Sequence, residues 1–127
     1  MPAANRDECA AAIERGIAKV DRYVREISPV FVRSDVYAQL LRMRLFAEAL
    51  GIASVDEAAA ERDAAEAARS QLESADVRID GGFGFGRKSG DLLPFVNPVS
   101  TAFCAQALAM WSDRRAGKLT VDRHSLV

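Results

Sequence analysis

Three polar residues at helical spacing are the first candidates for ligand chemistry in this chain. Asp35, Gln39 and Arg42 follow one another at intervals of four and three residues, which places them along one stripe of a helix. An acid, an amide and a guanidinium on one stripe can bind a polar ligand if the stripe lines a cavity. The same stripe can also be a solvated face with an Asp-to-Arg contact. The sequence leaves both interpretations open.

Gln106 is a fourth candidate for ligand binding. Ala102, Ala105 and Ala109 form a strip of small residues on the expected helix, and Gln106 lies beside this strip. A polar amide among alanines either satisfies a neighbouring backbone group or contacts a ligand. We therefore add Gln106 to the candidate ligand-binding residues.

A glycine-rich stretch is the most unusual feature of the chain, and it reads Gly81-Gly82-Phe83-Gly84-Phe85-Gly86-Arg87-Lys88. A phosphate cradle needs a strand before the glycines and a helix directly after them, and the sequence indicates neither. We interpret the stretch as structural, because glycines allow positive φ and close backbone approach while phenylalanines fill a seam between helices. The predicted structural residues are Gly81, Gly82, Phe83, Gly84, Phe85, Asn97 and Thr101.

No catalytic constellation is indicated. The one histidine, His124, lies too near the end of the sequence for a Ser-His-Asp or Cys-His arrangement, and Asp80 and Asp91 have no paired carboxylate. Cys9 and Cys104 lack the short spacing of a metal site and are interpreted as thiols in a reducing compartment. We predict no catalytic residue, no metal and no cofactor.

The helix expected to hold the first stripe runs from Ser34, as its cap, to Leu50, with Gly51 following its C-terminus. It has two apolar faces separated by narrow polar stripes, which is typical of an inner helix with neighbours on both sides. The preceding helix begins at Asn5 and has one apolar stripe, which is typical of an outer helix. That stripe consists of Ile13, Ile17, Val20, Val24 and Ile27.

Two further helices are predicted in the second half. Ser54 with Glu57 forms a capping box for an alanine-rich outer helix over about residues 55–73. A long loop without strand periodicity follows, over about residues 74–96. Asn97 then caps an inner helix with Pro98 at its first position and Gly117 closing it.

These helices fit one all-α domain over residues 1–117, followed by a loose tail at 118–127. The formal net charge of −1 argues against nucleic acid or an anionic membrane as the main partner. No apolar run is long enough for a membrane span, and no signal peptide is evident. A cytoplasmic location is expected.

An internal repeat pairs the two inner helices. Residues 38–43 and 105–110 share four of six residues at a constant offset of 67. The chain then divides into two αα-hairpins, over about 5–50 and 54–116, each with an outer and an inner helix. A hairpin repeat of this kind needs neighbours to bury its inner faces.

The second hairpin resembles the (α/α) toroid superfamily of squalene-type terpenoid cyclases and protein prenyltransferase β subunits. The residues that carry the resemblance are Gln71, Asp80-Gly81-Gly82-Phe83-Gly84, Thr101-Ala102-Phe103 and Ala107-Leu108. They match the superfamily's turn and the start of its inner helix over about 40 residues. The resemblance implies two hairpins of an incomplete toroid, similar to its C-terminal end.

The departures from the superfamily concern its chemistry. Cyclases that resemble this pattern carry a catalytic Asp-x-Asp-Asp-Thr-Ala motif where this chain has Asn97-Pro98-Val99-Ser100-Thr101-Ala102. Prenyltransferases bind zinc through Asp-x-Cys and a distant histidine, which Asp7, Cys9 and His124 match only in form. The sequence does not indicate whether these three residues meet.

We therefore expect a non-catalytic, toroid-like fragment that acts as a structural or binding module. It would associate with itself or with a second chain that covers the inner helices. The alternative is that the chain contributes to the cavity of a prenyltransferase-like, cyclase-like or carbohydrate-processing toroid enzyme completed by another chain. The ligand of either form is not indicated.

Overall fold

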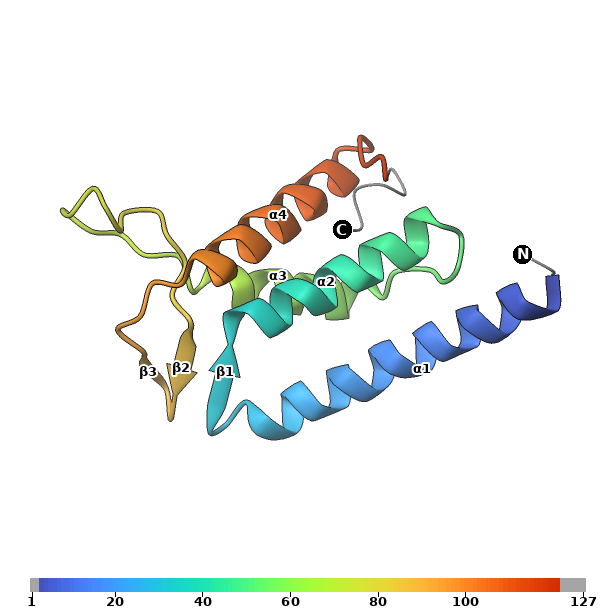
Figure 1. Cartoon of the computed structure of the whole chain (residues 1–127), viewed down its shortest axis with the longest axis horizontal. Helices are drawn as coiled ribbons and strands as arrows, with labels where there is room; N and C mark the ends of the chain where they lie inside the picture. Colours follow the sequence, from blue (N-terminus) through green and yellow to red (C-terminus); the bar gives the residue numbers. More distant parts are fainter. Residues whose placement is uncertain (1–2, 122–127) are drawn as a thin grey trace.

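The computed structural model describes residues 3–121, which form four helices and a small sheet (Figure 1). The expectation of a mostly helical protein with four helices is confirmed. The helices are α1 (Ala3–Ile27), α2 (Ser34–Ala49), α3 (Glu57–Ala68) and α4 (Pro98–Arg115). The strands are β1 (Phe31–Arg33), β2 (Gly86–Lys88) and β3 (Asp91–Leu92).

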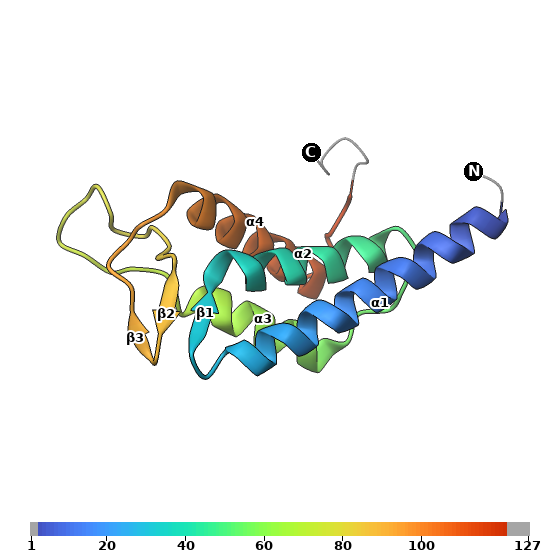
Figure 2. The ribbon, with the colours of Figure 1, turned by 60° about the horizontal axis from the view of Figure 1, so that its bottom comes forward.

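α2 is the central helix of the fold. It lies between α1 and α4, and α3 packs against both α2 and α4 (Figures 1 and 2). α2 and α4 run in the same direction, whereas α1 and α3 run the opposite way. The sheet lies at the end where α2 begins. This central position agrees with the two apolar faces expected of α2.

The core is built from α2, α3, α4 and one aromatic residue of the loop, Phe83. Alanines supply much of the contact surface, which lets the helix backbones approach closely. Leu41 and Leu45 of α2 and Trp111 of α4 are the large side chains of this cluster. The remaining members are Ala38, Ala60, Ala64, Ala67, Cys104 and Ala107.

The expectation of an all-α fold was incomplete, because the chain also forms a three-stranded antiparallel sheet in the order β1-β2-β3. Phe31 pairs with Lys88, and Lys88 also pairs with Asp91. Strands of two or three residues are too short to show an alternating pattern. The loop interpretation of residues 74–96 was therefore wrong at 86–88 and 91–92.

Two local features explain why this hairpin forms where it does. Ser89 and Gly90, the two residues between the paired Lys88 and Asp91, both have positive φ, of 50° and 86°, as a two-residue type I′ turn requires. Gly86 allows β2 to approach β1 closely, since a Cβ atom there would lie 1.9 Å from the Val32 carbonyl oxygen.

The helix caps were predicted in part. The Asn97 side chain accepts hydrogen bonds from the backbone of Val99 and Ser100, which confirms it as the cap of α4. Ser34 and Ser54 are not caps. The Ser34 hydroxyl instead donates to the carbonyl of Gly84 at 2.6 Å, and Asp56 caps α3.

α3 ends five residues earlier than expected because the following backbone pairs with the glycine-rich loop. The Leu72 amide donates a hydrogen bond to the Gly82 carbonyl, and the Gly84 amide donates one to the Ser70 carbonyl. At the other end of the chain, Leu119 packs against the core, so the segment expected as a loose tail makes contacts at its start. Residues 122–127 lie outside the described part.

Candidate functional site

α1 leaves its apolar stripe partly exposed. Among the side chains of residues 5–27, which are the ones described on this helix, only Asp21 is buried. Val20 is 41% exposed and Ile27 is 52% exposed, whereas Ile13 and Ile17 are half-buried. A helix that buries an aspartate rather than its aliphatic stripe is incompletely packed within this chain.

A groove of about 350 Å³ runs between α1 and α2. Asp35 and Gln39 lie on its wall, so two of the candidate ligand residues do line a cavity. The rest of the lining is almost wholly apolar. It consists of Ile13, Gly16, Ile17, Val20, Val36, Leu40 and Met43.

Arg42 meets Gln39 one turn further along α2. Its Nη1 donates a hydrogen bond to Gln39 Oε1 at 2.5 Å. The guanidinium carbon lies 5.5 Å from the centre of the Phe46 ring and 5.2 Å from the centre of the Phe103 ring. Arg42 therefore connects the groove to the seam between α2 and α4.

The charge of Arg42 is uncompensated by any described residue. The side chain is only 9% exposed, its Nε is buried without a hydrogen-bond partner, and no described carboxylate forms an ion pair with it. Burial lowers the pKa of this guanidinium from its usual value. A buried charge without a counter-ion costs several kcal/mol in order of magnitude, so this position is unfavourable for the isolated side chain.

Asp35 is already paired. Arg33 donates to its two carboxylate oxygens at 3.0 and 2.7 Å, and this contact raises the pKa of Arg33. The Asp-to-Arg contact considered from the sequence therefore exists, but with Arg33 rather than Arg42. Asp35 therefore adds to the groove wall a carboxylate whose charge is already balanced by Arg33.

Gln106 lies apart from the other three candidates. Its side chain is exposed on α4, next to the exposed alanines at positions 102, 105 and 109. One turn earlier on the same helix, Phe103 contacts Arg42. The structure thus brings Asp35, Gln39 and Arg42 to one region and leaves Gln106 in solvent beside it.

The glycine-rich loop holds the start of α4 through backbone contacts. Phe83 is buried in the core, and its amide donates to the Thr101 hydroxyl at 3.0 Å. Gly81 has a φ of 76°, and its carbonyl accepts a hydrogen bond from the Gln71 side chain. Phe85 lies partly exposed, with its ring 6.1 Å from that of Phe31. The remaining predicted structural residues are Gly82, Gly84 and Asn97. Their backbone amides donate hydrogen bonds to backbone carbonyls.

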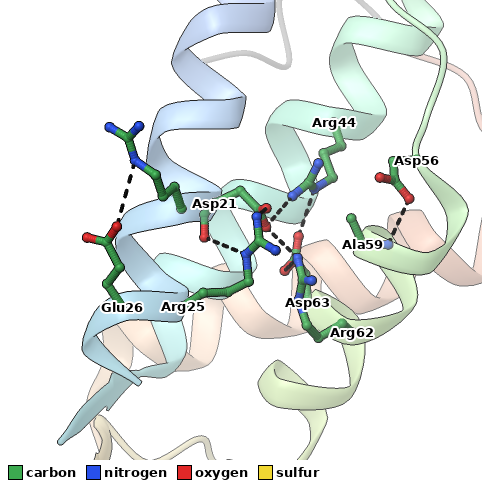
Figure 3. A network of polar contacts seen from close by, with 9 residues as sticks. Asp21, Arg25, Glu26, Arg44, Asp56, Ala59, Arg62 and Asp63 are labelled. Atoms are coloured by element: carbon green, nitrogen blue, oxygen red, sulfur yellow. Dashed lines mark hydrogen bonds and ion pairs between the residues drawn. The ribbon is translucent and has the colours of Figure 1, made fainter. Parts of the chain in front are cut away.

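A buried ion network joins α1, α2 and α3 (Figure 3). Arg44 donates to Asp63 at 2.8 Å and to Asp21 at 2.9 Å, and Arg62 also contacts Asp21. Asp63 is fully buried, and this burial raises the pKa of its carboxyl group although Arg44 opposes the shift. Arg25 closes the network through Asp21 at 2.7 Å.

Sequence reasoning missed this network. Arg44 belongs to one of the narrow polar stripes of α2, and Asp63 lies in the alanine-rich α3, so the sequence pattern of neither helix indicates the partner. One signal was present: Asp63 shares a helix face with Ala59, Ala60 and Ala67, all of which are buried. A lone acid on the small-residue face of a helix indicates a buried partner.

The described residues contain no group of three or more metal-ligating side chains. Cys9 is exposed on α1, whereas burial raises the pKa of the Cys104 thiol to about 11, so that this thiol stays protonated at neutral pH. His124 lies outside the described residues. Within residues 3–121, no helix combines the length and apolar character needed to cross a membrane.

Comparisons with protein-family models, with curated proteins and with solved structures gave no match for the chain.

Proposed function

We propose that the chain is a non-catalytic association module whose α1–α2 groove pairs with a second copy. The single observation that carries this proposal is the half-covered apolar stripe of α1 facing an apolar groove. An amphipathic helix lying in such a groove is a common mode of protein recognition. The toroid-like arrangement implied by the resemblance would instead place the partner on the inner helices, so the groove beside α1 is a different surface for association.

The spacing of the stripe supports a helical occupant. Its five residues, from Ile13 to Ile27, follow intervals of four, three, four and three. That is the seam of a heptad repeat, which is narrower than the apolar face of most surface helices. α1 has 25 residues and is therefore about 37 Å long, enough to present this seam to a partner helix.

Charge complementarity favours a second copy in antiparallel orientation. Residues 5–15 carry three acids and two arginines, whereas residues 16–27 carry three cations and two acids. An antiparallel pair of α1 helices brings the negative half of each next to the positive half of the other. Such a two-fold arrangement is closed and stops at the dimer.

Covering the exposed parts of Val20, Ile27 and Met43 contributes on the order of 1 kcal/mol for each side chain. Over both copies these three side chains contribute about 6 kcal/mol before the entropic cost of association is subtracted, so the half-buried residues of the groove have to contribute as well.

Sedimentation velocity tests the proposal. The wild-type chain is expected to sediment at twice its monomer mass, and Val20→Lys is expected to sediment as a monomer because it places a charge in the seam. Val77→Lys is the matched control, since Val77 is 89% exposed on a loop far from the groove. A monomeric wild type at all concentrations, or equal effects of the two variants, would contradict the proposal.

A further inference from the structure

Arg42 is a buried cation that has no carboxylate partner among the described residues. It lies in the seam between α2 and α4, between the rings of Phe46 and Phe103, and its charge has no described counter-ion. We propose that Arg42 is a binding site for the carboxylate of an apolar monocarboxylic acid. This site goes beyond the association proposed above and does not depend on it.

One edge of the Arg42 guanidinium has no hydrogen-bond partner among the described residues. Gln39 occupies Nη1, so Nε and Nη2 remain without a hydrogen bond to any described residue. These two nitrogens form the side edge of the guanidinium, whose two parallel N–H groups match the two oxygens of a carboxylate. Nε is buried and Nη2 makes no hydrogen bond to a described residue, so a carboxylate binds Nη2 first and reaches Nε only after the side chain shifts.

Gln39 also positions the guanidinium. Its Oε1 accepts from Nη1 at 2.5 Å, which fixes the plane of the side chain while leaving the opposite edge free. A glutamate at this position would have neutralised the charge; the neutral amide does not. Gln39 therefore fixes the position of the Arg42 guanidinium without balancing its positive charge.

The residues around Arg42 favour a ligand with one negative charge and an apolar body. Arg33 is bound to Asp35, and Arg114 is bound to Glu48 and Glu57, so these cations are already paired. A single available guanidinium suits a monoanion better than a phosphate, which carries up to two charges. The rings of Phe46 and Phe103 beside Arg42 provide an apolar surface for the rest of the ligand.

The test uses the full chain labelled with ¹⁵N-arginine and hexanoate as the probe. The Nε–Hε signal of Arg42 is assigned by its loss in Arg42→Lys. We expect a saturable shift of this signal on addition of hexanoate, while the Nε–Hε signal of Arg44, which is paired with Asp63, stays in place. Hexanamide, which has the same chain without the charge, is expected to cause no shift.

Two variants test alternative explanations of the shift. Arg42→Lys tests whether any positive charge at this position is enough, and Val20→Lys tests whether hexanoate binds only to the associated form. Arg42→Lys keeps the charge but lacks the two-pronged edge. In a uniformly ¹⁵N-labelled sample, its affinity for hexanoate, followed on the backbone amide of Phe103, is expected to fall about tenfold or more. Val20→Lys, which interrupts the proposed association, is expected to leave the Arg42 shift unchanged because the site consists of α2 and α4 of one chain.

Three results would overturn the proposal. One is the absence of a saturable Arg42 shift in the wild-type chain. Another is an equal shift with hexanamide, which would indicate an apolar site only. The last is loss of the hexanoate response in Val20→Lys, which would assign the site to the associated form.

Discussion

Arg42 and Arg44 lie two residues apart on α2 and are almost equally buried, at 9% and 8% exposed, but within residues 3–121 only Arg44 contacts carboxylates. Two residues correspond to about 200° around a helix, so the two side chains point to opposite sides. Arg44 reaches Asp21 and Asp63, whereas Arg42 reaches a glutamine and two phenylalanine rings. The same residue type therefore has opposite energetic roles on one helix.

Replacing Arg42 by methionine is expected to stabilise the fold. Methionine keeps the unbranched stem against Phe46 and Phe103 but removes an uncompensated buried charge. We expect the free energy of unfolding to rise by about 1 kcal/mol in urea titrations at one low protein concentration. A loss of stability of the same size would show that the guanidinium is favourable where it lies.

Replacing Arg44 by methionine is expected to have the opposite effect. The change leaves the fully buried Asp63 with Arg62 alone, at 3.7 Å, and removes one cation from Asp21. We expect a loss of about 3 kcal/mol in the same titrations. Arg22→Met is the control, because the contacts of Arg22 with Glu26 and with the Tyr23 ring are exposed, and it should change stability by less than about 0.5 kcal/mol. Equal effects of the two variants would mean that the network is not formed.

The stability of the fold is expected to fall in acid partly through Glu48. Arg114 holds the Glu48 carboxylate at 2.6 and 3.0 Å and lowers its pKa below the ordinary value of 4.5. A folded-state pKa below the unfolded value stabilises the fold above that ordinary pH, and this stabilisation is lost as pH falls through the folded-state pKa. The pair is partly exposed, so solvent screening limits its contribution to about 1 kcal/mol or less.

Glu48→Gln tests this contribution. Urea unfolding from about pH 6 to about pH 3 is expected to give a smaller decrease in stability for the variant than for the wild type. Glu73→Gln should retain the wild-type slope, because Glu73 is exposed and forms no ion pair within the described residues. An unchanged slope in Glu48→Gln would contradict the assignment.

The parts of the fold that could be predicted from the sequence are those decided by neighbouring residues. Asn97 and Pro98 specify the start of α4 because both the cap and the fixed φ act within one turn. Gly51 and Gly117, with φ of 69° and 70°, end α2 and α4 for an equally local reason.

The remaining features depend on residues far apart in the chain. β1 finds its partner about 55 residues later, and neither short strand has a pattern of its own. Likewise, Arg42 and Arg44 both belong to polar stripes of α2, and only the positions of α1 and α3 decide which one meets an acid. The sequence therefore predicts that Asp35, Gln39 and Arg42 share one helix stripe. It does not predict that Arg42 lacks a carboxylate partner among the described residues.

Gly86→Ala is expected to disrupt the pairing of β1 with β2. The added Cβ would lie 1.9 Å from the Val32 carbonyl oxygen and 2.9 Å from its carbonyl carbon, and these backbone atoms cannot move without displacing the strand. We expect a loss of about 2 kcal/mol in the free energy of unfolding, which is typical of overpacking. Amide hydrogen exchange should rise at Ser34, whose amide donates to the neighbouring Phe85 carbonyl.

Gly16→Ala is the matched control, because its Cβ would meet no atom within 4 Å and alanine favours the helix by about 1 kcal/mol. If both variants gained stability, the close approach of β1 and β2 would be incorrect.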